Sequence, residues 1–560
     1  MTRAPDLFAP DLARFRRSPK TVMRLSRLGA AHPTRLSFLR ILLRRMRTEG
    51  WQVDRRLFDI DERGVGRAVY CVRGPVRTYS LVAFGHDLPA DERSDRVIAT
   101  AWDATFALFD GVPDADDLAR LQANVPLQEA GRISQRELTL SRANRSVRLF
   151  DHVVATLAEG RQPDANVLAE TGYLMRTTAV YGSGKFGAAC HGDIVDRPEM
   201  SAPFQAEMLT VWLIRAFTVD LVDHLARLRG GPNAARLDDD LRRGLGVGNS
   251  TGLGMAPFLV RHPALLHNWI FAREEALARV RAQPVMAPGT RAAFARAISA
   301  ARECARQWRS AHPLQMPRLA GLRSDLDRIE RHSRDMLQAP DPQPWDRLWR
   351  WGEASLTLEG QEALLAAMLE PHGPLIDDLG DALCADEAAC FDIDGAMSVG
   401  TLRAIMANTY DWADAGAYGA TEGCARFWYV SEDKLEPRLG ERHTEPGAER
   451  ELPLDIGRRA AALSAELETA DPEEAIAHLL LRMPQHRYMV RRVQIAATRP
   501  YAEIRDNLIS ADVMPIDMLR CKLACFGARQ FDPRSDRWVR INLFQDAPFP
   551  GDLNGPDIAR

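Results

Sequence analysis

The segment of this chain best suited to chemistry is a short glycine-rich stretch around Lys185. Positions 182–187 read Gly-Ser-Gly-Lys-Phe-Gly and follow a strand-like run at 173–180. A glycine turn after a strand directs backbone N–H groups toward an anion, and the Lys185 amine adds a positive charge. This is not a P-loop, because Phe186 stands where that motif has the hydroxyl residue that holds magnesium. The substrate-binding residues predicted here are Gly182, Ser183 and Gly184.

Lysine is rare in this chain. Of 73 basic residues only four are lysine, at positions 20, 185, 434 and 522. This bias indicates a GC-rich bacterial genome in which interchangeable lysines have become arginines. A retained lysine is more often one whose amine is needed, since lysine can act as a base and arginine cannot. We therefore predict a catalytic role for Lys185, with a solvent-facing lysine in a glycine turn as the alternative.

A second group of reactive residues, Cys190, His191 and Asp193, follows directly. A thiol and an imidazole can form a nucleophile and its base, with a carboxylate to orient the imidazole. Neighbours in sequence rarely pair in that way, so Cys190 is more simply a small buried apolar residue. His191 with Asp193, in a loop beside glycines, is the better candidate for acid/base chemistry.

The second glycine-rich segment covers positions 244–254, with five glycines in eleven residues. Its exposed amides and short polar side chains suit a phosphate or a carboxylate. It fails the dinucleotide-binding fingerprint, and no strand–helix–strand unit is expected around it. Close helix packing or a flexible lid would be the structural alternative. The substrate-binding residues predicted in this segment are Asn249, Ser250, Thr251 and Gly252.

A third candidate region surrounds the aromatic run at 427–430, with Glu422, Glu432 and Lys434 nearby. It could form a second wall of a pocket, although such charged runs are usually solvated faces. No metal site is predicted. Asp220 and His224, four residues apart on a helix, are explained more simply by a hydrogen bond between them in a helical core.

Apolar residues at helical spacing are the dominant local pattern of the sequence. A helix is expected at 34–50, an antiparallel meander at 51–84, helices at 97–109 and 147–157, and mostly helix at 202–336. Since strands and helices do not alternate, no doubly wound parallel sheet is predicted. The expected fold class is mainly α with small antiparallel β elements (α+β), divided into several domains.

The domains are expected at 1–90, 91–337 and 345–560, with a proline-rich linker between the last two. A net charge of −3 and a pI near 6.5 give no reason to expect nucleic acid or an anionic membrane as partner. Eight scattered cysteines and no apolar leader or spanning segment predict a cytoplasmic protein. A homo-oligomer is compatible with the sequence, which indicates no particular cofactor.

Together these features predict a bacterial enzyme that acts on a small anionic substrate held by the two glycine-rich segments. Lys185 would serve as electrostatic clamp or base, and His191 as acid/base. Two alternatives stay open. One is a nucleotide-dependent transferase or ligase in which Glu422 or Glu432 helps bind magnesium. The other is a helical scaffold or regulatory protein whose glycines serve packing alone. Both site hypotheses assume that the two glycine-rich segments face each other.

Overall fold

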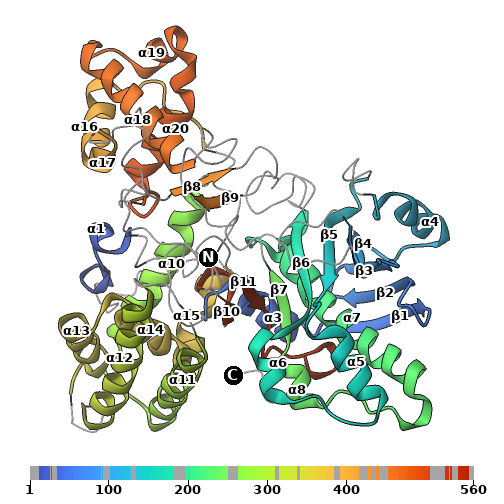
Figure 1. Cartoon of the computed structure of the whole chain (residues 1–560). Helices are drawn as coiled ribbons and strands as arrows, with labels where there is room; N and C mark the ends of the chain where they lie inside the picture. The colour runs from blue at the N-terminus through green and yellow to red at the C-terminus, as the bar shows by residue number, and fades with distance from the viewer. Residues whose placement is uncertain are drawn as a thin grey trace.

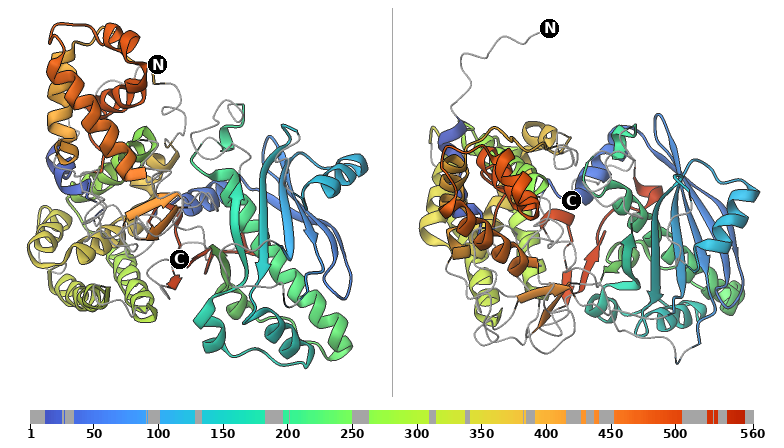
Figure 2. Two further views of the ribbon diagram at one scale, coloured as in Figure 1. Left: turned by 45° about the horizontal axis from the view of Figure 1, so that its top comes forward. Right: turned by 90° about the horizontal axis from the view of Figure 1, so that it is seen from above.

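The computed structural model combines one large sheet with a mostly helical half (Figure 1). It describes residues 12–24, 27, 35–89, 91, 101–127, 134–181, 196–200, 202–249, 263–308, 315–336, 341–381, 383, 391–414, 427–430, 437–440, 452–504, 524–528, 530–532 and 540–553. In both views of Figure 2 the sheet lies to one side of the helices that follow it in sequence.

The sheet contains nine strands among the described residues, in the order β1-β2-β3-β4-β5-β6-β7-β11-β10. Its strands are β1 (Gln52–Ile60), β2 (Gly66–Arg73), β3 (Thr78–Gly85), β4 (Ala104–Asp110), β5 (Glu137–Arg145), β6 (Tyr173–Tyr181), β7 (Gly246–Asn249), β11 (Arg540–Leu543) and β10 (Gln530–Asp532). Strands β6 and β7 pair in parallel, and the other neighbours pair antiparallel.

The predicted fold class, mainly α with small antiparallel β elements, is therefore wrong, because the sheet is large and mixed. The meander expected at 51–84 is confirmed as β1–β3, but the helix expected at 97–109 is wrong. Six of the seven residues of β4 are buried, and such a continuous apolar run looks the same in a strand and in a buried helix. Strand β5 is almost wholly buried although it carries several polar residues, so its sequence lacks the apolar–polar contrast of a surface strand.

Helices cover both faces of the sheet. Helix α4 (Ala115–Asn124) covers one face, where Leu121 packs in a small core with residues of β2–β5. The other face carries α7 (Gln205–Gly230), with α3 (Phe38–Thr48) and α5 (Phe150–Ala158) against it. Nearly every residue in the first four turns of α7 is buried, as expected of a helix enclosed on all sides. Helix α7 is thus packed along the sheet, in contact with strands β3–β7 as well as with α3 and α5.

The sequence β6–α7–β7 forms a strand–helix–strand unit with parallel strands, which corrects the expectation that no such unit surrounds the second glycine-rich segment. Two short helices, α6 (Ala165–Thr171) and α8 (Asp239–Arg243), precede β6 and β7. Strand β7 also pairs with β11, about 290 residues further along the chain, and this places the C-terminal strands inside the sheet (Figure 1). The sheet consequently draws strands from all three segments proposed as domains.

The helical half follows β7. Its helices are α10 (Pro263–Arg281), α11 (Pro288–Gln307), α12 (Gln315–Met336), α13 (Pro344–Ser355), α14 (Leu358–Leu369), α15 (Gly373–Asp381), α16 (Val399–Thr409), α17 (Asp411–Asp414), α18 (Leu452–Thr469), α19 (Ile476–Arg482) and α20 (Arg487–Thr498). The aromatic run at 427–430 forms strand β8 (Phe427–Val430), which pairs antiparallel with β9 (Pro437–Gly440). A buried ion network ties Arg17, next to α1 (Pro19–Val22), to Glu274 at 2.6 Å and to Glu362 at 2.6 Å.

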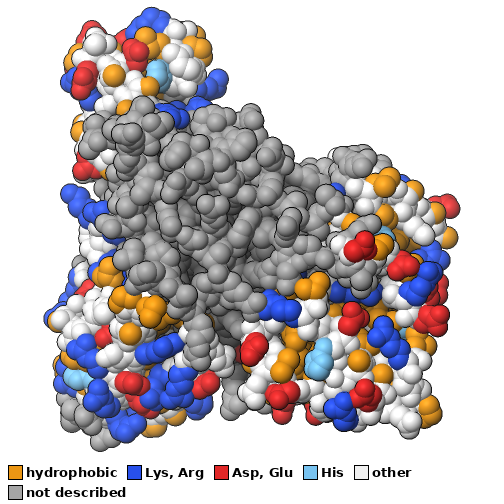
Figure 3. Space-filling model, in the orientation of Figure 1, with side chains coloured by type: hydrophobic (Ala, Val, Ile, Leu, Met, Phe, Trp, Pro, Cys, Tyr) orange, Lys and Arg blue, Asp and Glu red, His pale blue; other side chains and the backbone are white. Residues whose placement is uncertain are grey.

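Basic and acidic side chains are interspersed on the face shown in Figure 3. Among the described helices, none combines the length and the apolar character needed to cross a bilayer.

Candidate functional site

Most residues predicted to form the site lie outside the residues that the structure describes. These are Gly182, Ser183, Gly184, Lys185, Cys190, His191, Asp193, Ser250, Thr251 and Gly252. Three residues of the third candidate region, Glu422, Glu432 and Lys434, also lie outside the described residues. Asn249 is described, as are the strands and the helix that lead into and out of both glycine-rich segments.

The first glycine-rich segment begins at the end of β6, and the second contains β7 and continues beyond its end. Strand β6 ends at Tyr181, directly before Gly182, and β7 ends at Asn249, directly before Ser250. The strands run in parallel, with Thr177 opposite Asn249. Carboxyl ends of parallel neighbours meet at one edge of a sheet, so the chain leaves both strands toward that edge. On the far side, β7 pairs antiparallel with β11, so strand direction changes here; in open α/β sheets ligands bind at such carboxyl ends.

Asn249 and Thr177 tie the end of β7 to the middle of β6, four residues before β6 ends at Tyr181. The Asn249 Nδ2 donates to Thr177 Oγ1 at 3.3 Å, and the Thr177 hydroxyl donates to the Gly248 carbonyl at 3.4 Å. The Asn249 side chain is buried, with 7% of the residue exposed. In the described arrangement its amide therefore links β7 to β6.

Packing accounts for two glycines of the second segment. A Cβ atom on Gly248 would lie 2.9 Å from the ring of Tyr173, and one on Gly246 would lie 2.6 Å from the Leu543 carbonyl. Both positions need glycine because neighbouring strands approach closely. The packing alternative thus explains these two glycines, while Gly252 and Gly254 lie outside the described residues.

Helix α7 begins at the same edge. Its Thr210 hydroxyl lies 2.7 Å from that of Thr139 on β5. Next to Thr139, Leu140 pairs with Tyr181, the last residue of β6, so the first turns of α7 lie at the carboxyl end of β6. The helix N-terminus has the backbone polarity that favours negative charge.

The residue that caps α7 has an unusual backbone. Phe204 has φ of +60°, a left-handed conformation that is costly for a bulky residue, and its side chain supplies no cap hydrogen bond. Its ring is packed between Phe38 and Phe526, with centroids 5.5 Å and 5.1 Å away. Aromatic packing therefore fixes the start of α7 where a glycine would have been the less strained choice.

Glu207, in the first turn of α7, is the functional candidate that sequence reasoning missed. It precedes Thr210 by three residues and so lies on the same side of the helix. Only 4% of it is exposed, and its Oε1 has no hydrogen-bond partner among the described residues. Burial raises the pKa of Glu207 to about 8, which a hydrogen bond from its own backbone N–H offsets only in part. The carboxyl is therefore mostly protonated at neutral pH and can donate a hydrogen bond. The one sequence signal was an acid directly before seven uncharged residues.

The chain returns to this edge through an anchored segment at 196–200. Arg197 Nε donates to Asp110 at the end of β4 at 3.1 Å, and the Tyr79 hydroxyl of β3 donates to Glu199. Arg45 of α3 donates to the Glu199 carbonyl at 2.9 Å. Both ends of the stretch that contains Lys185 are thus fixed at the same edge, by β6 before it and by this anchor after it.

The expected hydrogen bond between Asp220 and His224 is wrong. Asp220 accepts from the Tyr70 hydroxyl at 2.7 Å, and the His224 Nε2 lies 2.8 Å from the Ile60 carbonyl. The described residues contain no cluster of three acidic, histidine or cysteine side chains able to hold a metal ion. The two residues do line a pocket, which is treated below.

Comparison with protein-family models, with curated proteins and with solved structures gives no match to this chain. What the edge formed by β6, β7 and α7 can bind therefore has to follow from its own residues and geometry.

Proposed function

We propose that the protein is an enzyme that acts on a small anionic molecule, a carboxylate or a phosphate, at the carboxyl ends of β6 and β7. One observation carries the proposal: the first glycine-rich segment and the remainder of the second, from position 250, follow neighbouring parallel strands, at the edge where α7 begins. Backbone N–H groups of glycine turns and the N-terminus of a long helix both favour an anion. Their convergence supports one binding site instead of two unrelated turns.

In this proposal the segment after β6 supplies most of the chemistry. Lys185 acts as electrostatic clamp or base, and His191, oriented by Asp193, acts as acid/base, with Cys190 as a further candidate nucleophile. The anion is bound by Gly182, Ser183, Gly184, Ser250, Thr251 and Gly252. Asn249 contributes by fixing the end of β7 to β6.

Glu207 adds a proton donor to this assignment. A carboxylic acid kept neutral by burial can donate a hydrogen bond to an anionic oxygen, whereas an ionised one would repel it. Its raised pKa and its free oxygen support a place beside the anion. Because the group holds its proton near neutral pH, it could also pass that proton to a substrate oxygen.

Ligand-dependent stabilisation tests this function. We expect a phosphate or carboxylate from a panel of small anions to raise the melting temperature, because a ligand at 100 times its Kd stabilises the folded state by about 2.7 kcal/mol. Stabilisation only by ATP with magnesium would support the nucleotide-dependent transferase or ligase instead. If no small anion stabilises the protein, the scaffold alternative holds and the proposal is wrong.

Turnover of the anion that stabilises the protein, compared between wild type and Lys185→Arg, assigns the effect to the site. The substitution keeps the charge and removes the titratable amine, so we expect turnover to fall at least tenfold while folding is unchanged. Lys20→Arg, a matched exchange in α1, should leave both unchanged. Full activity of Lys185→Arg would show that the amine is not needed.

A further inference from the structure

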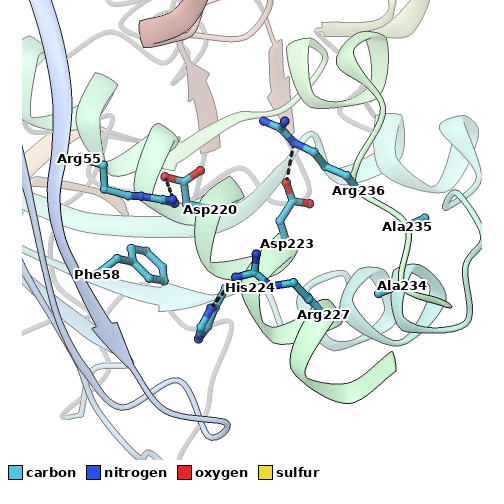
Figure 4. A pocket seen from close by; sticks show the side chains of 9 residues that line it. All are labelled: Arg55, Phe58, Asp220, Asp223, His224, Arg227, Ala234, Ala235 and Arg236. Atoms are coloured by element: carbon cyan, nitrogen blue, oxygen red, sulfur yellow. Dashed lines mark hydrogen bonds and ion pairs between the residues drawn. The ribbon is translucent and has the colours of Figure 1, made fainter. Parts of the chain in front are cut away.

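A cavity lies beside the C-terminal half of α7, whereas Glu207 lies in the first turn of this helix (Figure 4). It has a volume of about 450 Å³. Its walls are Arg55 and Phe58 of β1, one side of α7 from Asp220 to Arg227, and residues 234–236 before α8. Asp220 follows Glu207 by 13 residues, which at 1.5 Å per residue places the two about 20 Å apart along the helix axis. This cavity is therefore separate from the edge formed by β6 and β7.

Both carboxylates in the cavity already have partners. Asp220 accepts from the Tyr70 hydroxyl and lies 3.0 Å from Arg55 Nη1. Asp223 accepts from Arg236 Nε at 3.3 Å and from the Leu237 backbone N–H at 3.1 Å. Neither carboxylate is left to attract a cation.

Arg227 is the arginine of the cavity that has no carboxylate partner among the described residues. Its Nη2 donates to His224 Nδ1 at 3.3 Å, while the His224 Nε2–H donates to the Ile60 carbonyl at 2.8 Å. In this arrangement one ring nitrogen accepts and the other donates, so His224 supplies Arg227 with a hydrogen-bond acceptor and no carboxylate. No carboxylate lies within ion-pair distance of Arg227 in the described part of the chain. Three arginines against two aspartates leave the cavity with one net positive charge.

Arg227 and Arg236 lie on opposite walls of the cavity, and each has N–H groups that the contacts described above do not use. Arg227 comes from α7 and Arg236 from the segment before α8, and Figure 4 shows them on either side of Asp223. Each guanidinium uses one N–H group in the contacts described, so its other N–H groups can donate hydrogen bonds to an oxyanion. Phe58, which packs edge-on against His224 with centroids 5.2 Å apart, adds an apolar wall.

We propose that this cavity binds a small organic anion through a phosphate or carboxylate group held by Arg227 and Arg236, with its apolar body against Phe58. The volume favours an organic molecule over bare phosphate, because it lies in the range of small-molecule sites. This binding is independent of the reaction proposed at the strand ends, and α7 connects the two places.

Calorimetric titration of the full chain with phenyl phosphate and with phthalate tests the proposal and tells a phosphate from a carboxylate ligand. We expect saturable binding of at least one probe, weakened at least tenfold by Arg227→Gln and by Arg236→Gln. Arg229→Gln is the matched control, because Arg229 is exposed on the same helix and does not line the cavity. It should change the Kd less than twofold.

Three outcomes would overturn the proposal. The first is the absence of saturable binding of either probe to the wild-type protein. The second is an equal loss with Arg229→Gln, which would show a general charge effect. The third is loss of binding with Lys185→Arg, which would place the probe at the strand ends. Unfolding curves of each variant separate a lost contact from a lost fold.

Discussion

Arg215→Met is expected to lower the free energy of unfolding by about 4 kcal/mol, since several buried carbonyls would each lose a donor at a cost of about 1 kcal/mol or more. Arg215 is only 1% exposed in the middle of α7. It donates to the carbonyls of Leu245 at 2.6 Å, Ala547 at 2.8 Å and Arg243 at 3.0 Å. Its guanidinium also lies 3.9 Å from the ring centre of Phe549. Burial lowers the pKa of Arg215 to about 9, which still leaves it charged at neutral pH.

Because these carbonyls lie next to β7 and β11, Arg215→Met should loosen these two strands as well as lower the stability of the whole fold. Leu245 directly precedes β7, and Ala547 follows β11, so Arg215 fixes β7, which pairs with β6, together with β11 on the other side of β7. Denaturant unfolding measures the loss, with Arg229→Met as the control at an exposed site of the same helix. Hydrogen exchange should rise first at 245–249 and 540–547. A loss below about 1 kcal/mol would mean that water or neighbouring donors replace the guanidinium.

Glu207→Gln is expected to remove a pH dependence of stability. The folded protein holds the Glu207 proton up to a pKa of about 8, whereas the unfolded chain releases it near pH 4.5. Between these values the folded state binds more protons, so stability is full below about pH 4.5 and falls as pH rises to about 8. The expected loss is roughly 3–5 kcal/mol across this window.

The measurement compares the free energy of unfolding at pH 5 and pH 8.5 in both proteins. The difference between the two pH values should be smaller in Glu207→Gln by about 3 kcal/mol or more. Because only the change in unfolding free energy with pH is compared, the pH-independent cost of burying a glutamine amide cancels. Glu170→Gln, at an exposed position of α6, is the control and should keep the wild-type slope. Identical slopes in wild type and Glu207→Gln would show that the buried carboxyl is ionised in the folded state.

The sequence predicted those elements whose surface pattern is regular. The amphipathic helix α3 ends near Gly50 as expected, and β1–β3 follow the turn signals between them. Strand β4 was mistaken for helix because it is buried on both faces. The pairing of β7 with β11 joins residues about 290 apart, and a four-residue strand rich in glycine carries no pattern that predicts it.

The candidate site was predictable only in part. Glycine density singled out the segments that follow β6 and contain β7, yet Gly246 and Gly248 serve strand packing. Glu207 and Arg215 could not be singled out, because their importance comes from complete burial, and burial of α7 depends on a sheet that the sequence pattern did not reveal. The roles of Lys185 and of the other residues of the two segments remain predictions.

The most direct test of the central claim is whether Lys185 and position 250 face one site. The chain has only four lysines, so few amines compete with Lys185. In a variant whose eight native cysteines, Cys190 among them, are replaced by alanine or serine, an amine-to-thiol cross-linker of about 10 Å, the width of a small-molecule pocket, can join Lys185 to Ser250→Cys. Ala292→Cys, exposed on α11, serves as the control. Mass spectrometry should find the 185–250 link at least tenfold more often than a link from Lys185 to position 292. If Lys185 reacts with the reagent but never links to position 250, the two glycine-rich segments do not form one site.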